Sequence, residues 1–275
     1  MTLALGIWYS ISIGIGDFFG GYVTRRSLAL TTVITALLGG VAISALGVIV
    51  IPSELLSVDV GLGAASGLTI GFALMFMYHG MSLSSAAVVS PIVAVLAALF
   101  PVGYDLSTGA SLPGLVTLGI AVAVVGLSLS TISPELGDGL RSGIVWAIAS
   151  GVAFGIALTL LGQTSSASGA WPALAQRVVA GVILALVATA RSLPRLVLPG
   201  LRRLAVLSGV LGGSGVVAFA LGAQRGSLSE IAVTSSMFPA VTAVLSAMFD
   251  GHPLRWWQMV GIGTCITGVA MIGVG

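Results

Sequence analysis

The segment SPIVAVLAALF at residues 90–100 returns in altered form as FPAVTAVLSAMF at residues 238–249. Glycines repeat around both segments, in the matched pairs Gly6 and Gly143, Gly14 and Gly151, Gly63 and Gly209, Gly67 and Gly213, Gly119 and Gly261, and Gly126 and Gly268. This repetition predicts a chain of two related halves, residues 1–137 and 138–275. In membrane proteins such internal repeats are typical of transporters, because two similar halves can rock against each other.

Hydrophobic residues make up 57% of the chain and charged residues only 7%, which excludes a water-soluble domain of this length. A membrane-spanning helix needs about 20 apolar residues, and the stretches 27–53, 106–134 and 142–176 carry no charged residue. Because no period-two alternation points to a β-barrel, we predict an all-α integral membrane protein. Its ten expected transmembrane helices span residues 2–23, 28–51, 60–80, 83–103, 112–132, 140–163, 169–190, 204–224, 228–249 and 254–274.

Each half then holds five helices, which is an odd number. Five crossings carry the chain to the opposite side of the membrane, so the second half begins where the first did not. The halves are therefore expected to form inverted five-helix repeats around a central cavity.

All ten basic residues are arginines, and they gather on one side of the predicted membrane. The connections after the first, fifth, seventh and ninth helices hold Arg25, Arg26, Arg141, Arg191, Arg195, Arg202, Arg203 and Arg255. The other side holds only Arg225. Basic loops favour the cytoplasm, so both termini are predicted to be periplasmic. The use of arginine alone, together with abundant Ala and Gly, suggests a GC-rich bacterial genome and hence a bacterial inner membrane.

The matched prolines, Pro91 and Pro239, lie inside predicted helices. A proline removes one helical hydrogen bond and bends the helix, so we expect hinges at these two positions. The freed carbonyls and the hydroxyls of Ser90, Ser235 and Thr242 then either line a polar cavity or satisfy the bent backbone internally.

Asp17 is a candidate site residue, because an ionisable side chain inside a predicted span is a functional-site hypothesis by default. Its alternative role is that of an interfacial residue paired with Arg25. Tyr78 and His79 end the third predicted helix. They either line the rim of the cavity, where a ring and a hydrogen-bonding group would orient a substrate, or anchor the helix at the membrane interface.

Arg177 lies in the seventh predicted helix, where it either snorkels to the surface or attracts an anionic group such as a carboxylate. Gln163, at the end of the sixth helix, is a similar candidate without a charge. The aromatic side chains of Phe72, Phe154 and Phe238 either line an apolar pocket or pack in the core or against lipid.

Several activities are excluded by what the sequence lacks. It contains no Lys and no phosphate-binding glycine-rich loop, so it is not an ATP-driven pump. No His, Cys, Asp or Glu set has metal-ligand spacing, and the two histidines, His79 and His252, suggest no Ser-His-Asp arrangement. We therefore expect no enzyme activity, no cofactor, no metal and no nucleic acid partner.

Residues 238–261, FPAVTAVLSAMFDGHPLRWWQMVG, resemble the EamA-type repeat of the drug/metabolite transporter superfamily. The likeness lies in a proline-containing helix, a short acidic turn, an aromatic-Gln pair and a glycine-rich last helix. Asp250-Gly251-His252 stands where the family usually has Leu-Gly-Glu, and Arg177 falls at a position that is often basic in that family.

Within this superfamily the chain is similar to bacterial exporters of aromatic and other neutral amino acids of the YddG type. This resemblance implies a basket of helices with a central cavity lined by helices 1, 3, 4, 6, 8 and 9, and transport by alternating access. It also implies cytoplasmic termini, in contrast to the prediction from the arginines.

The leading hypothesis is therefore an inner-membrane transporter that exports neutral, mainly aromatic, amino acids. Its expected partners are the small-molecule substrate and the lipid bilayer, and the expected state is a monomer. An exporter of other small metabolites or apolar drugs is the alternative transporter, and a structural membrane subunit is the alternative without transport.

Overall fold

The computed structural model describes residues 2–84, 86–107, 114–131, 138–225, 235, 238–249 and 255–274. Over these residues the regular structure is all helical and no strand occurs, as predicted. The α-helices are α1 (Thr2–Thr24), α2 (Ala29–Val50), α3 (Ser57–Leu83), α4 (Ala86–Ser107), α5 (Gly114–Thr131), α6 (Asp138–Gly162), α7 (Trp171–Ala190), α8 (Arg202–Arg225), α10 (Phe238–Phe249) and α11 (Trp256–Val274). Two short 3₁₀-helices cover Ser166–Ser168 and Pro199–Leu201.

Two sequence predictions fall partly outside the described residues. Most of the first half of the ninth predicted helix, residues 228–249, is not described, and neither is the turn at residues 250–252. The number of ten crossings and the inverted relation of the halves therefore remain predictions.

Within the part of the chain that the structure describes, five helical stretches are long and apolar enough to cross a membrane: Ala29–Val50, Ser57–Leu83, Arg141–Gly162, Trp171–Ala190 and Pro199–Gln224. Their outward faces are apolar as well. Leu38, Val145 and Leu186 are each more than half exposed, and water would not tolerate so many such side chains on one surface. These faces fit the acyl chains of a bilayer.

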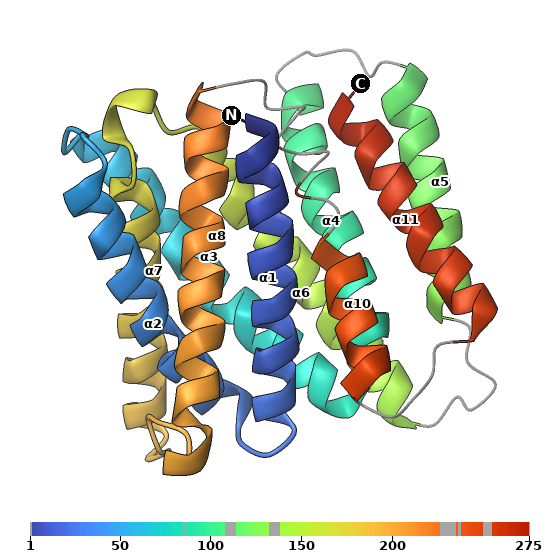
Figure 1. Cartoon of the computed structure of the whole chain (residues 1–275), viewed down its shortest axis with the longest axis horizontal. Coiled ribbons are helices and arrows are strands. Elements are labelled where there is room, and N and C mark those ends of the chain that lie inside the picture. Colours follow the sequence, from blue (N-terminus) through green and yellow to red (C-terminus); the bar gives the residue numbers. More distant parts are fainter. Residues whose placement is uncertain are drawn as a thin grey trace.

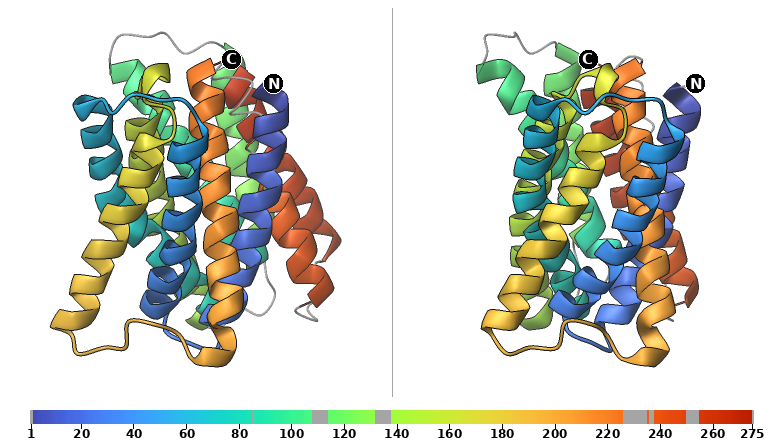
Figure 2. Two further views of the ribbon diagram at one scale, coloured as in Figure 1. Left: turned by 60° about the vertical axis from the view of Figure 1, so that its left-hand side comes forward. Right: turned by 90° about the vertical axis from the view of Figure 1, so that its left-hand side faces the viewer.

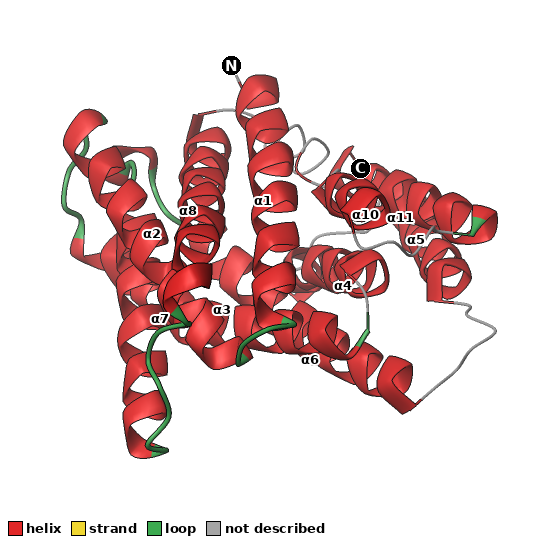
Figure 3. Cartoon of the chain, turned by 60° about the horizontal axis from the view of Figure 1, so that its bottom comes forward, coloured by secondary structure: helices red, strands yellow, loops and turns green. Residues whose placement is uncertain are grey.

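The helices of the first half pack mainly against helices of the second half. The most extensive contacts join α3 with α6 and α7, α8 with α1 and α2, and α5 with α11. Helices α5 and α11 lie side by side at one edge of the molecule, and α2 and α7 lie at the other (Figures 1 and 3).

Matched glycines make the close helix contacts possible. A β-carbon on Gly63 or Gly67 of α3 would collide with the backbone of Pro172 or Gln176 of α7. A β-carbon on Gly209 or Gly213 of α8 would collide in the same way with the backbone of Ala36 or Gly40 of α2. Helices in lipid associate through such close approach, because burial from water no longer drives them together.

The pair α5 and α11 shows the same reciprocity. Gly126 of α5 faces the backbone of Gly261 and Cys265 in α11. Gly268 of α11 faces the backbone of Gly119 and Ala123 in α5. Each helix therefore offers the other the same kind of glycine surface.

Both chain ends lie on the same face of the molecule (Figure 1). On that face the α2–α3 and α6–α7 loops meet, while the α7–α8 connection crosses the opposite face (Figure 2). Asp59 at the start of α3 accepts hydrogen bonds from the Ser165 backbone N–H at 3.0 Å and from its hydroxyl at 2.6 Å. The Glu54 N–H donates to the Ala167 carbonyl at 2.8 Å. These bonds fasten a loop of the first half to a loop of the second.

Candidate functional site

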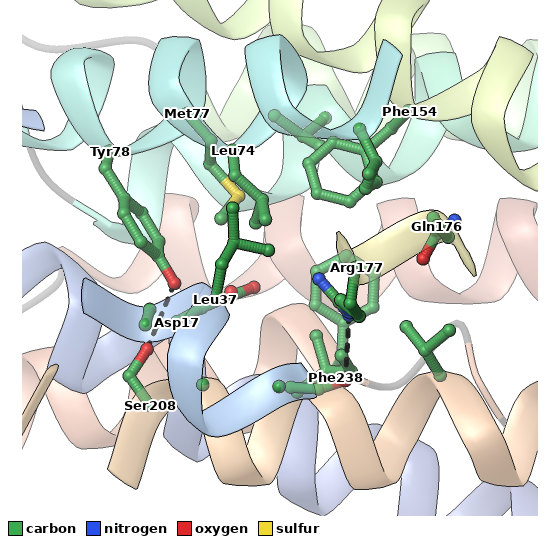
Figure 4. A pocket seen from close by; sticks show the side chains of 18 of the residues that line it. Asp17, Leu37, Leu74, Met77, Tyr78, Phe154, Gln176, Arg177, Ser208 and Phe238 are labelled. Atoms are coloured by element: carbon green, nitrogen blue, oxygen red, sulfur yellow. Dashed lines mark hydrogen bonds between the residues drawn. The ribbon is translucent and has the colours of Figure 1, made fainter. Parts of the chain in front are cut away.

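A cavity of about 60 Å³ lies between the helices of the two halves (Figure 4). Helices α1, α2, α3 and α4 of the first half and α6, α7, α8 and α10 of the second half all contribute to its wall. Helices α2 and α7 are additions to the set that the family resemblance implied. Its apolar lining consists of Ile13, Ala36, Leu37, Ile70, Leu74, Met77, Val93, Ala97, Phe154, Leu158, Val216 and Phe238.

Arg177 is the positive charge of the cavity. It lies in the second turn of α7 and is 5% exposed, so it does not reach the surface. Its Nη2 donates to the Gly212 carbonyl of α8 at 3.0 Å. Its Nε is buried and has no hydrogen-bond partner among the described residues. At least one buried donor of the guanidinium therefore has no acceptor among the described residues.

Asp17 of α1 is the acidic residue of the same cavity, and it is 6% exposed. Within the described part of the chain, no hydrogen bond and no ion pair within 4.0 Å joins its carboxylate to another residue. An ionised group in a membrane is costly unless it is paired or meets a ligand. Neither charge of this cavity is neutralised by a direct partner.

Gln176, the neighbour of Arg177, is fully buried and held by a short chain of hydrogen bonds. Its Nε2 donates to the Ser66 hydroxyl of α3 at 2.7 Å. Ser66 in turn donates to the Ala157 carbonyl of α6 at 2.7 Å. The Gln176 Oε1 has no partner among the residues described, so a second polar atom of the lining is unsatisfied.

Tyr78 of α3 reaches across to the second half. Its hydroxyl lies 3.1 Å from the Ser208 hydroxyl of α8, and Ser208 donates to the Gly16 carbonyl of α1 at 2.8 Å. Since Ser208 has a single proton, Tyr78 donates to Ser208. The ring of Tyr78 lies against Gly20, where any β-carbon would collide with it.

Aromatic rings make up one stretch of the cavity wall. The Tyr9 ring is 6.4 Å from the Phe238 ring, in an edge-to-face arrangement, and 5.5 Å from the Phe219 ring. Phe154 lines the cavity from α6 (Figure 4). A flat apolar group fits such a wall better than a polar one.

Four of the residues predicted from the sequence line this cavity: Asp17, Tyr78, Phe154 and Phe238. The other predicted residues do not belong to its described lining. The His79 ring lies edge-on against Trp146 at 5.0 Å. Phe72 packs on Phe76 at 6.2 Å. Gln163 is exposed at the end of α6, where it contacts Tyr104 and Thr159.

The predicted hinge region holds the remaining candidates. Ser90 and Pro91 are buried in α4, and Ser235 is buried as well. Thr242 donates to the carbonyls of Gly14 and Phe238, both at 3.1 Å, and so ties α10 to α1. Pro239 belongs to the first turn of α10. Bending at the two prolines stays a prediction.

Sequence reasoning missed Tyr9, Gln176 and Ser208, and it left the direction of Arg177 open. One signal was present: Gln176 and Arg177 are adjacent polar residues inside an otherwise apolar helix. For Ser208 no such signal exists, because serines are spread over the whole chain. In the described ranges, no cluster of three or more His, Cys, Asp or Glu residues is placed to hold a metal ion.

Residues 141–274 match the EamA-like transporter family. This half of the chain is an EamA domain. The EamA match and the apolar helices together indicate a multi-pass membrane protein, and the family suggests transport of small molecules across that membrane. The cavity is lined by helices of the EamA domain together with helices of the first half.

Among solved structures, a crystal structure of a protein shares the fold with a TM-score of 0.66. The similarity covers 98% of this chain and 97% of that chain at 15% sequence identity, so it speaks for the fold alone. No curated protein matches the sequence.

Proposed function

We propose that the chain is a bacterial inner-membrane transporter that exports neutral, mainly aromatic, amino acids by alternating access through the cavity. The observation that carries this proposal is that two buried side chains of opposite formal charge, Arg177 and Asp17, line one cavity and have no charged partner within 4.0 Å among the described residues. A neutral amino acid supplies both missing partners at once. Its carboxylate pairs with Arg177, and its ammonium pairs with Asp17.

The apolar lining supports an apolar side chain on the substrate. Leu74, Met77 and Phe154 lie on one side of the cavity and Phe238 on another (Figure 4). An uncharged drug would also fit these walls, but it would leave both charges without a partner at a cost of several kcal/mol. A zwitterion with an apolar side chain satisfies the charges and the walls together.

Inversion-related halves are a common basis for alternating access, because one half can rock against the other. Reciprocal contacts support this relation, because α3 packs on α6 and α7 as α8 packs on α1 and α2. The glycines at these contacts are the ones that the sequence repeat pairs. The cavity is too small for an aromatic amino acid, so we propose that the halves move apart on one side to admit it.

The arginines support an orientation with periplasmic termini. Arg25 and Arg26 follow α1, and Arg191 and Arg195 follow α7, on the face opposite the chain ends (Figure 2). Basic loops are retained in the cytoplasm. The face with the chain ends would then be periplasmic.

Flux of labelled phenylalanine into proteoliposomes tests the proposal. Saturable uptake above empty vesicles is expected for the natural protein. Arg177→Met should weaken binding at least about tenfold, because hydrogen bonds to charged groups contribute about 1.5–3 kcal/mol. Arg195→Met is the matched control, since Arg195 is exposed and bonds only to Thr189 outside the cavity.

The alternatives predict other results. A carrier of apolar drugs would transport them without competition from phenylalanine and would tolerate Arg177→Met. A structural subunit would show no rise in melting temperature with any amino acid, whereas a ligand that binds the folded state raises it. Absence of saturable phenylalanine flux would rule out the proposed substrate.

A further inference from the structure

Two neighbouring residues of α7 each present one unsatisfied polar atom. The Arg177 Nε is a donor without an acceptor, and the Gln176 Oε1 is an acceptor without a donor. Both side chains line the cavity, at 5% and 0% exposure. A buried polar atom without a partner costs about 1–3 kcal/mol, so a ligand that satisfies both atoms gains from each.

The direction of the Gln176 amide follows from its hydrogen bonds. The Ala157 carbonyl can only accept, so the single proton of Ser66 is directed to it. Ser66 can then only accept from Gln176, which places the Gln176 NH₂ group on Ser66. The carbonyl oxygen is left on the side of Arg177, as Figure 4 shows. Ser66 thereby fixes an acceptor that cannot turn away.

An acceptor next to a guanidinium donor recognises a ligand with the complementary order. The ligand needs a carboxylate for Arg177 and, one or two bonds away, an N–H or O–H donor for Gln176. A carboxylate that lacks such a neighbouring donor would leave the Gln176 oxygen unsatisfied. Sites built around a buried polar group reject analogues that cannot pair with it.

We infer that Gln176, held by Ser66, is a specificity-determining residue that requires a hydrogen-bond donor on the carbon next to the carboxylate of the transported molecule. This inference rests on the proposed function, because it concerns amino acids in the same cavity. It differs from the role of Asp17, which responds to positive charge. The Gln176 oxygen responds to a donor, whether charged or neutral.

Three ligands with the same ring and carboxylate separate these roles. Phenylalanine has a charged donor, 3-phenyllactate has a neutral one, and 3-phenylpropionate has none. Their Kd values are measured by calorimetric titration of the purified full chain in nanodiscs. Gln176→Met should weaken phenylalanine about tenfold and phenyllactate about fivefold, and leave phenylpropionate unchanged. Asp17→Asn should weaken phenylalanine alone.

Two further variants provide a second test and a control. Ser66→Ala frees the amide to rotate but keeps the acceptor, so it should weaken the same two ligands about two- to threefold. It also carries the test if Gln176→Met does not fold. Gln163→Met, a Gln→Met change at an exposed position outside the cavity, should leave all three Kd values unchanged.

The outcomes are distinct. If Gln176→Met weakens all three ligands equally, Gln176 only supports the cavity wall and the inference is overturned. If the natural protein binds phenylalanine and phenylpropionate with equal affinity, no donor is required and the inference is overturned while a carboxylate site remains. If the natural protein binds none of the three, the proposed function fails and the inference falls with it.

Discussion

At matched positions of the two halves, α7 carries Gln176 and Arg177 where α2 carries Gly40 and Val41. The match follows from the packing, because Gly67 lies against Gln176 as Gly213 lies against Gly40. The helix backbones therefore repeat, whereas the polar side chains do not. The polar pair Gln176 and Arg177 is therefore present in one half only.

The missing side chain at Gly40 is what makes room for Arg177. A β-carbon at Gly40 would lie 3.3 Å from the Arg177 Cδ and 3.4 Å from the Gly209 carbonyl oxygen. The guanidinium continues past this point to the Gly212 carbonyl. A glycine in one half thus forms the slot into which the charge of the other half extends.

The pair α1 and α6 shows the same asymmetry. Asp17 of α1 corresponds to Phe154 of α6, by the spacing of Gly14 and Gly151, and both residues line the cavity. The same position of the repeat therefore carries a carboxyl group in α1 and an aromatic ring in α6. A substrate with an ammonium at one end and a ring at the other has a single preferred direction between them.

The largest effects are expected from substitutions of the matched glycines at which helices of the two halves touch. Gly209→Ala sets a methyl group against the Ala36 backbone, and Gly63→Ala sets one against the Pro172 backbone. Because backbone cannot move as a side chain does, each change should cost at least about 3 kcal/mol and abolish most folded protein. Yield of monodisperse protein and its melting temperature measure this. If the two variants lose yield and melting temperature to the same extent, the α3–α7 and α8–α2 contacts are equivalent.

Gly263→Ala is the matched control, because a β-carbon at Gly263 meets nothing within 4 Å. It should leave yield and melting temperature unchanged or slightly raised. If Gly63→Ala is tolerated while Gly209→Ala is not, the two contacts are not equivalent.

A smaller effect is expected when a methyl group is added at Gly40, beside the Arg177 side chain. Gly40→Ala places a methyl group against the flexible Arg177 stem, which can shift by a few tenths of an ångström. Folding should survive, and phenylalanine binding should weaken by about 1 kcal/mol, or roughly fivefold, because the guanidinium is displaced. Ligand titration measures the change.

Gly181→Ala, on α7 itself, controls for a methyl group added near the same helix pair. Its β-carbon would meet only Leu37, at an ordinary distance of 3.8 Å. Binding should be unchanged in this variant. A Gly40→Ala protein with unaltered affinity would show that Arg177 does not depend on the slot.

The sequence was informative where a pattern depends on neighbours along the chain. Apolar length and glycine spacing predicted an all-helical membrane protein, and the structure confirms its helical class over the described residues. Asp17 was found from the cost of a charge in a membrane, and its burial agrees with that reasoning. The inverted relation remains a prediction that the reciprocal contacts support.

What the sequence could not supply was the rotation of each helix about its axis. Arg177 could snorkel or point inward, and only the contact with Gly40 and Gly212 decides between these directions. Tyr78 and His79 are adjacent, yet Tyr78 faces the cavity and His79 faces Trp146. Such choices depend on partners more than 30 residues away, which periodicity does not reveal.

The smallest expected effect concerns the matched pair Tyr78 and Gln224, which sit at corresponding positions of α3 and α8. Tyr78 donates to Ser208 in the other half. Gln224 donates to Thr164 at 3.3 Å and to the Gly169 carbonyl at 3.2 Å, and its Oε1 has no partner among the described residues. Tyr78 thus joins α3 of the first half to α8 of the second half. Gln224 instead joins α8 to the α6–α7 loop, and its Oε1 is left unsatisfied.

Tyr78→Phe removes a well-formed hydrogen bond while the ring still fills the space beside Gly20, so it should cost about 1 kcal/mol. For a chain of this size that corresponds to a fall in melting temperature of about 2–4 °C. Gln224→Met removes two longer bonds but also the unsatisfied oxygen, so its melting temperature should stay close to that of the natural protein. A larger loss for Gln224→Met than for Tyr78→Phe would contradict this reasoning. It would mean that the contact of Gln224 with the α6–α7 loop, inside the second half, stabilises the fold more than the Tyr78–Ser208 contact between the halves.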